Sequence, residues 1–167
     1  MRDLDPSDLR HLDAALGWLG LGCTPEARAE LDLISAVRQQ YPAVLAARWL
    51  LCVHEKRWPD ALKIAQAEVV AGPDDCAGWL HRAYALRRIP DGGLSQAWDA
   101  LLPAAEKFPD EPIVAFNLSC YACQMKQLDA ARHWLQQAMK IGGRDAIRKM
   151  ALADDDLQPL WAEIREL

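Results

Sequence analysis

Two cysteines three positions apart, Cys120 and Cys123, have the residue type and spacing of a redox-active pair. A thioredoxin-type pair lies at the start of a helix that follows a strand, where the helix dipole lowers the thiol pKa. Here the pair falls in the middle of a segment whose apolar residues recur with helical period, and no run of the chain resembles a strand. We therefore predict buried, unreactive thiols. A thiol-active accessory protein that uses Cys120 and Cys123 stays open as an alternative function.

Other catalytic and metal-binding arrangements are less well supported. Zinc needs about four converging ligands, and His81 or His133 would have to complete the cysteine pair from different helices. Cys52 and His54 are two positions apart on a predicted helix, so their side chains point to different faces. The sequence has no phosphate-binding glycine loop, H-E-x-x-H helix or nucleophile elbow. We predict a protein without catalysis, cofactor or metal ion.

Composition restricts the partner and the compartment. The 24 acidic and 19 basic residues give a net charge of −5, which argues against a nucleic-acid partner because phosphates are bound mainly by Lys and Arg. A hydrophobic content of 51% indicates a folded domain with a core. The opening residues 1–8 are polar and acidic, unlike a signal peptide, and no apolar run approaches the roughly 20 residues that span a bilayer. We expect a cytoplasmic protein with reduced cysteines and no membrane partner.

The elements that would position any site follow from an internal repeat. Four alanines in segments of helical period, Ala27, Ala61, Ala97 and Ala131, are spaced 34, 36 and 34 residues apart. Residues that end helices keep the same register, since Pro73, Pro109 and Gly143 each follow their alanine by 12 positions. Periods of 20 to 50 residues are typical of solenoids, propellers and arrays. Apolar side chains at three- and four-residue steps make every segment between these markers helical.

With this period the chain resembles the tetratricopeptide repeat (TPR) family, whose unit is a 34-residue helix-turn-helix with small residues where its helices touch. The third and fourth repeats carry the family pattern most fully, at Trp79, Ala83, Leu86, Leu94, Ala97, Leu101, Ala104 and Pro109 and at Leu118, Ser119, Leu128, Ala131, Leu135 and Ala138. The second repeat departs from it twice, with bulky Trp49 where a small residue is usual and Glu68 where alanine is expected. The resemblance implies an all-α, right-handed superhelical α-solenoid of antiparallel helix pairs.

The predicted organisation is four repeats followed by a cap. Repeats occupy residues 1–143, with a degenerate first unit over 8–41 and further units over 42–75, 76–111 and 112–143. Residues 144–167 contain two apolar-faced segments around the acidic triplet Asp154, Asp155 and Asp156. Because a stack of repeats exposes an apolar end, we predict that this segment caps it. The triplet is expected to cap the last helix.

The resemblance also implies a site, because in TPR proteins the first helix of each repeat lines a concave groove. Transferring the groove positions gives a predicted peptide-binding set of His54, His81, Tyr84, Arg87, Arg88, Phe116, Asn117 and Gln124. Aromatic side chains could fill pockets of a bound peptide while amide side chains hold its backbone. Arg87 and Arg88 would attract an acidic group; they equally fit a solvated helix end, where cations are favoured.

These observations predict a non-enzymatic scaffold that binds an extended or helical segment of a partner protein. A secretion-type chaperone for an exported client is the alternative from a different binding class. The sequence leaves the partner's identity and the oligomeric state open.

Overall fold

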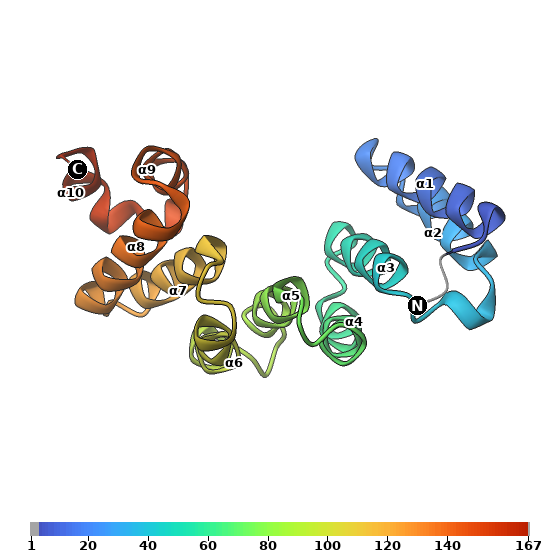
Figure 1. Ribbon diagram of the computed structural model, residues 1–167, viewed down its shortest axis with the longest axis horizontal. Helices are drawn as coiled ribbons and strands as arrows, with labels where there is room; N and C mark the ends of the chain where they lie inside the picture. Colours follow the sequence, from blue (N-terminus) through green and yellow to red (C-terminus); the bar gives the residue numbers. More distant parts are fainter. Residues whose placement is uncertain (1–3, 167) are drawn as a thin grey trace. The chain divides into compact units, whose positions relative to one another are not determined.

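The computed structural model describes residues 4–166, and every regular element in that range is a helix (Figure 1). The predicted all-α class is therefore confirmed. Met1, Arg2 and Asp3, part of the segment used to argue against a signal peptide, lie outside the described residues, as does Leu167 at the end of the predicted cap. No helix within residues 4–166 is long and apolar enough to cross a membrane.

The chain divides into two compact units, Met1–Ala85 and Leu86–Leu167. The first unit contains α1 (Pro6–Gly20), α2 (Thr24–Leu33), the short 3-10 helix η1 (Ala36–Arg38), α3 (Pro42–His54), α4 (Trp58–Ala71) and nearly all of α5 (Cys76–Leu86). The second contains α6 (Leu94–Lys107), α7 (Pro112–Gln124), α8 (Leu128–Gly142), α9 (Arg144–Leu152), the 3-10 helix η2 (Asp155–Leu160) and α10 (Trp161–Glu166). The pairs α1 with α2, α3 with α4, and α7 with α8 pack as helical hairpins within their units.

The repeating alanines are completely buried. Ala27, Ala61, Ala97 and Ala131 all have 0% exposed surface. Each lies near the start of the second helix of its repeat, where a larger side chain would push the helices apart. The alanine spacing seen in the sequence is therefore a spacing of buried contact points.

The turn between the first and second helix also recurs at the repeat period. Gly22, Lys56 and Lys126 have positive φ angles of 74°, 56° and 64°, and Lys56 follows Gly22 by 34 residues. Glycine adopts this left-handed conformation without a Cβ penalty, whereas an L side chain costs roughly 1–2 kcal/mol. The two lysines show that helix packing on either side of the turn outweighs this local cost.

The core of the first unit is built by α1, α2 and α3. Leu12, Leu19, Leu31 and Leu51 are at most 5% exposed and form one cluster. A polar contact fixes the connection after α2, because Ser35 donates hydrogen bonds to the Asp8 carboxylate from Oγ (2.6 Å) and from its backbone N–H (2.8 Å). These hydrogen bonds lower the pKa of Asp8, so the carboxylate stays charged at this buried position.

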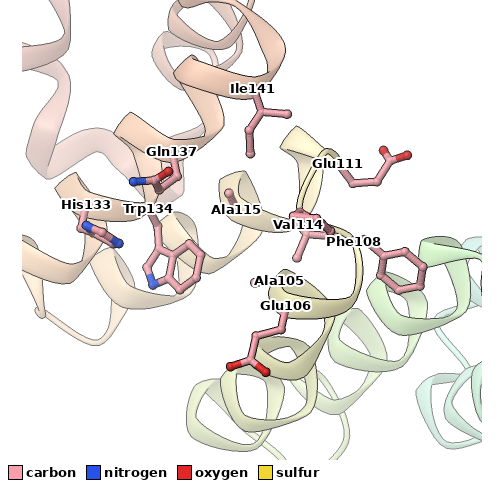
Figure 2. A pocket seen from close by; sticks show the side chains of 11 residues that line it. Ala105, Glu106, Phe108, Glu111, Val114, Ala115, His133, Trp134, Gln137 and Ile141 are labelled. Carbon is pink, nitrogen blue, oxygen red and sulfur yellow. The ribbon is translucent and has the colours of Figure 1, made fainter.

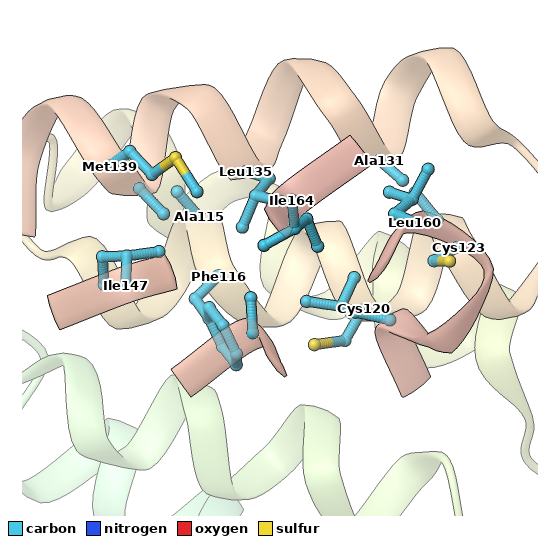
Figure 3. Packing of buried hydrophobic residues seen from close by; sticks show 14 residues of the cluster. Ala115, Phe116, Cys120, Cys123, Ala131, Leu135, Met139, Ile147, Leu160 and Ile164 are labelled. Carbon is cyan, nitrogen blue, oxygen red and sulfur yellow. The ribbon is translucent and has the colours of Figure 1, made fainter. Parts of the chain in front are cut away.

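The core of the second unit surrounds α7, which is buried on several faces at once. Figure 3 shows Phe116 and Cys120 of α7 packed with Leu135 of α8 and with Ile147 and Ile164 of the C-terminal segment. All five side chains are at most 5% exposed. The C-terminal segment thus contributes residues to this core.

Candidate functional site

The eight residues predicted to bind a peptide fall into both units. His54 on α3 and His81 and Tyr84 on α5 belong to the first unit, whereas Arg87 and Arg88 of the connection after α5 and Phe116, Asn117 and Gln124 on α7 belong to the second. The structure brings His81 and Tyr84 together in one cluster, and it brings Arg87 and Gln124 together in another.

His81 is held by two neighbours in the first unit. Its Nδ1 lies 2.7 Å from Oε2 of Glu68, a side chain that is only 8% exposed. Its ring stacks on the indole of Trp49, with centroids 3.7 Å apart and planes inclined by 9°. Because a carboxylate only accepts hydrogen bonds, His81 donates its Nδ1 hydrogen to Glu68. The histidine therefore has a fixed orientation and keeps 22% of its side chain exposed.

The two departures of the second repeat from the TPR pattern explain this arrangement. Trp49 stands where a small residue is usual and Glu68 stands where alanine is expected. Both contact His81, one through its ring face and the other through its Nδ1. Close packing is possible because the following helix has Gly78 at the crossing, where an added Cβ would lie 2.9 Å from the Val69 backbone nitrogen. Trp49 and Glu68 thus hold the same histidine, the first by ring stacking and the second by a hydrogen bond.

Tyr84 extends the same cluster. Its ring meets Trp49 edge-on at 5.9 Å and Trp58 at 6.0 Å. The indole Nε1 of Trp49 is buried without a hydrogen-bond partner among the described residues. His54 is exposed as the last residue of α3. We call Trp49, Trp58, His81 and Tyr84 the aromatic cluster; its four members are half-buried.

Arg87 is engaged by the C-terminal segment of the second unit. Its Nη2 donates to Oδ1 of Asp156 at 2.8 Å, and its Nη1 donates to Oδ2. The guanidinium also lies 5.8 Å from the ring of Tyr121. The Asp156 hydrogen bonds raise the pKa of Arg87, and burial raises the pKa of Tyr121 to about 12, although Arg87 and Arg88 act in the opposite direction. A bidentate arginine-carboxylate pair already fills the role that was predicted for an external acidic group.

The remaining α7 residues are also used within the second unit. Gln124 Nε2 donates to the backbone oxygen of Asp156 at 2.9 Å, and Asn117 Nδ2 donates to the Ile113 oxygen one turn earlier on its own helix. Phe116 is 5% exposed and belongs to the core. The 3-10 helix η2 packs directly on α7. The predicted groove face of α7 is therefore covered by the chain's own C-terminal segment, and peptide binding at these residues stays a prediction.

The cysteine pair has surroundings that suppress thiol reactivity. Cys120 and Cys123 are 3% and 2% exposed. Burial raises the pKa of both thiols, and for Cys120 the carboxylates of Asp154 and Asp156 raise it further. Because the thiolate is the reactive form, these surroundings argue against a thiol-active site.

Cys120 also forms a group of potential metal ligands with Asp154 and Asp156, whose ligand atoms lie within 4.8 Å of one another. The carboxylates of this group are already engaged by other parts of the protein. Arg87 holds both oxygens of Asp156, and Asp154 accepts a hydrogen bond from the backbone N–H of Asp156 at 2.9 Å. A bound cation would have to displace the guanidinium from its carboxylate. The acidic triplet thus caps η2 through Asp154 and pairs with Arg87 through Asp156.

A pocket of about 290 Å³ lies in the second unit, at a place that the groove prediction does not include. Figure 2 shows it between the last turn of α6, the connection to α7, and the outer face of α8. Its lining consists of Ala105, Glu106, Phe108, Pro109, Glu111, Val114, Ala115, His133, Trp134, Gln137 and Ile141. The sequence indicates this pocket only indirectly. Its one large aromatic residue on α8, Trp134, lies on the second helix of its repeat, away from the predicted groove.

Comparison with known proteins supports the fold. No protein-family model matches the sequence, and the comparison with curated proteins found no match either. Solved structures of similar fold include the MamA RS-1 ArsTM double mutant, 17% identical, with 83% of this chain and 76% of that chain covered and a TM-score of 0.67. They also include a thermophilic TPR protein of Thermus thermophilus, 19% identical, with 96% of this chain and 100% of that chain covered and a TM-score of 0.68. This chain therefore has a TPR-like helical-repeat fold, as its 34-residue period predicted.

Proposed function

We propose that the chain is a non-enzymatic protein-interaction scaffold that binds an extended or helical peptide segment at the first helices of the repeats in its first unit. The observation that supports this proposal is the aromatic cluster of the first unit, in which half-buried His81 and Tyr84 both contact the ring of Trp49. Tryptophan and tyrosine dominate the binding energy of many protein interfaces because they bury a large area with few rotatable bonds.

The proposed centre of binding is in the first unit, at His54, His81 and Tyr84. In the second unit Arg87 and Gln124 are held by Asp156, and Phe116 is part of the core. Substitutions at those positions would therefore report on folding. A peptide that uses the first unit meets side chains already oriented by packing, which lowers the entropy cost of binding.

The scaffold is favoured over the thiol-active alternative by the burial of both thiols. A secretion-type chaperone for an exported client differs from this scaffold in what it binds. It would hold its exported client in an extended form, whereas a peptide-binding scaffold selects segments that share a motif.

The experiment is selection of binding peptides from a random 12-residue library, followed by titration of the selected peptides against variants. We expect selected sequences to share a motif and the variant His54→Ala with Tyr84→Ala to weaken their binding about thirtyfold, the loss of one strong anchor. The control, Gln136→Ala with Tyr41→Ala, removes a polar and an aromatic side chain outside the aromatic cluster and outside the pocket of the second unit, and should leave the dissociation constant unchanged.

Melting curves of both variants establish that each is folded. If the folded His54 and Tyr84 variant binds every selected peptide as tightly as the wild type, the first-unit site is wrong. If only the control loses binding, the peptides occupy another surface and the first-unit site is wrong. A selection that returns no common motif would contradict the proposed scaffold.

A further inference from the structure

The pocket in the second unit is largely preformed. Its floor includes Val114 and Ala115, which are 1% and 4% exposed and fixed at the start of α7. Trp134 is held edge-on by Trp98 at 6.3 Å and by His133 at 5.5 Å. A ligand that enters therefore finds an ordered wall and a rigid floor, which reduces the entropy cost of binding.

The size of the pocket restricts the ligand. Sites for small molecules and cofactors are typically about 300–1,000 Å³, so a volume of about 290 Å³ lies at the lower limit. Such a volume accommodates one long amino-acid side chain and part of its neighbour.

The lining combines apolar surface with negative charge. Phe108, Trp134 and Ile141 give aromatic and aliphatic walls, and Figure 2 shows exposed Glu106 and Glu111 on opposite sides of the pocket. None of the lining residues is a lysine or an arginine, and the nearest cation on the same segment is Lys107, whose Nζ lies 5.8 Å from the Phe108 ring. The pocket is thus suited to a group with an apolar body and a positively charged end.

We propose that this pocket binds the side chain of an arginine or lysine, flanked by apolar residues, in a basic segment of a partner protein. The methylene stem would lie along Val114 and Ile141, as long basic side chains commonly bury their stems on apolar surface. The charged end is attracted by Glu106 and Glu111, and the face of Trp134 adds a cation-π contribution. The site shares no residue with the proposed peptide site of the first unit, so each can fail without the other.

The test measures fluorescence anisotropy of labelled peptides that differ only at the central residue. The probes are GSLRLSG, GSLKLSG and GSLELSG, titrated with the full chain at low ionic strength, where electrostatic attraction is least screened. We expect the arginine and lysine peptides to bind at least about tenfold more tightly than the glutamate peptide. Equal binding of all three, or no binding of the arginine peptide up to about 1 mM protein, overturns the proposal.

Two pairs of variants separate this pocket from general attraction to an acidic protein. Glu106→Gln with Glu111→Gln should weaken the arginine peptide about two- to thirtyfold, the range expected for two exposed ion pairs. The control, Glu26→Gln with Glu166→Gln, removes the same charge at exposed positions outside the pocket and should have no more than a twofold effect. Equal losses in both variants would mean that binding is not localised and would refute the site.

The second pair tests the volume. Gln137 lines the pocket, whereas its neighbour Gln136 is exposed and lies outside it. Gln137→Trp should fill the space and weaken the arginine peptide at least about tenfold, while Gln136→Trp should leave it unchanged. Full binding by a folded Gln137→Trp protein would show that the peptide does not enter the pocket.

Discussion

Replacing Leu157 by alanine should destabilise the second unit strongly, although the residue belongs to a short 3-10 helix near the end of the chain. Leu157 is 0% exposed, and it shares a cluster with Leu160 and Ile164 of its own segment and with Leu135 of α8. The substitution removes a branched side chain from a site where three elements meet. The packed neighbours can close the resulting cavity only in part.

The magnitude follows from this complete burial. Leu-to-Ala substitutions in cores cost about 2–5 kcal/mol, and we expect about 3 kcal/mol here. For a chain of this length 1 kcal/mol corresponds to about 2–4 °C in Tm, so the shift should be about 6–12 °C. Removing residues 144–167 altogether deletes four buried leucine and isoleucine side chains worth about 1.5–3 kcal/mol each. Their sum approaches the whole stability of a typical domain, and we expect aggregation of the truncated chain.

The assay is thermal and urea unfolding followed by circular dichroism. Met150→Ala is the matched control, because Met150 lies in the same C-terminal segment and is 41% exposed. The control should change the free energy of unfolding by no more than about 0.5 kcal/mol. If Leu157→Ala, with its helicity intact, melts at the same temperature as the control, the packing described for the C-terminal segment is incorrect.

Three further predictions concern the helix contacts and the thiols. Glu68→Ala restores the residue type of the TPR pattern, yet it should lower the free energy of unfolding in urea by about 1–3 kcal/mol because His81 loses its hydrogen-bond partner. Glu68→Gln keeps an acceptor oxygen and should lower it less. Ala97→Leu should cost about 1–3 kcal/mol by overpacking a position with 0% exposure, and unchanged melting would contradict the helix contact there. At neutral pH a thiol reagent should label half-buried Cys23 well before buried Cys120, because burial raises the pKa of the Cys120 thiol. Mass spectrometry of the labelled peptides measures this order, and earlier labelling of Cys120 would contradict the prediction.

The helical architecture could be predicted because its signal is local and periodic. Ala97 and Ala131 recur at the repeat spacing, and both are fully buried where helices touch. A small residue at this position is required within each repeat, so the sequence of a single repeat is enough to predict it. The burial of Cys120 followed from the same reasoning, since a position in the middle of a packed helix excludes water.

The candidate sites depended on pairings between distant elements, which periodicity does not encode. Trp49 and Glu68 were recognisable as departures from the TPR pattern, but the pattern does not specify that both contact His81. The acidic triplet was expected to cap the last helix, but Asp154 caps the 3-10 helix η2 that precedes α10. The pairing of Asp156 with Arg87 has no local signature.

The pocket of the second unit is a further case. Its walls come from three segments, each unremarkable in sequence, and its charge arises from Glu106 and Glu111 on either side of a helix end. Only the relative positions of α6, α7 and α8 turn these residues into one surface.

The pairing of Arg87 with Asp156 has a consequence for the order of folding. The two residues are 69 positions apart, about twice the separation of equivalent positions in neighbouring repeats. Closing a longer loop costs more chain entropy, and repeat arrays normally avoid that cost by growing from one unit to the next. The intervening helices α6, α7 and α8 must be close to their final positions before η2 can reach Arg87. We therefore expect the second unit to form in a single cooperative event that ends with loop closure.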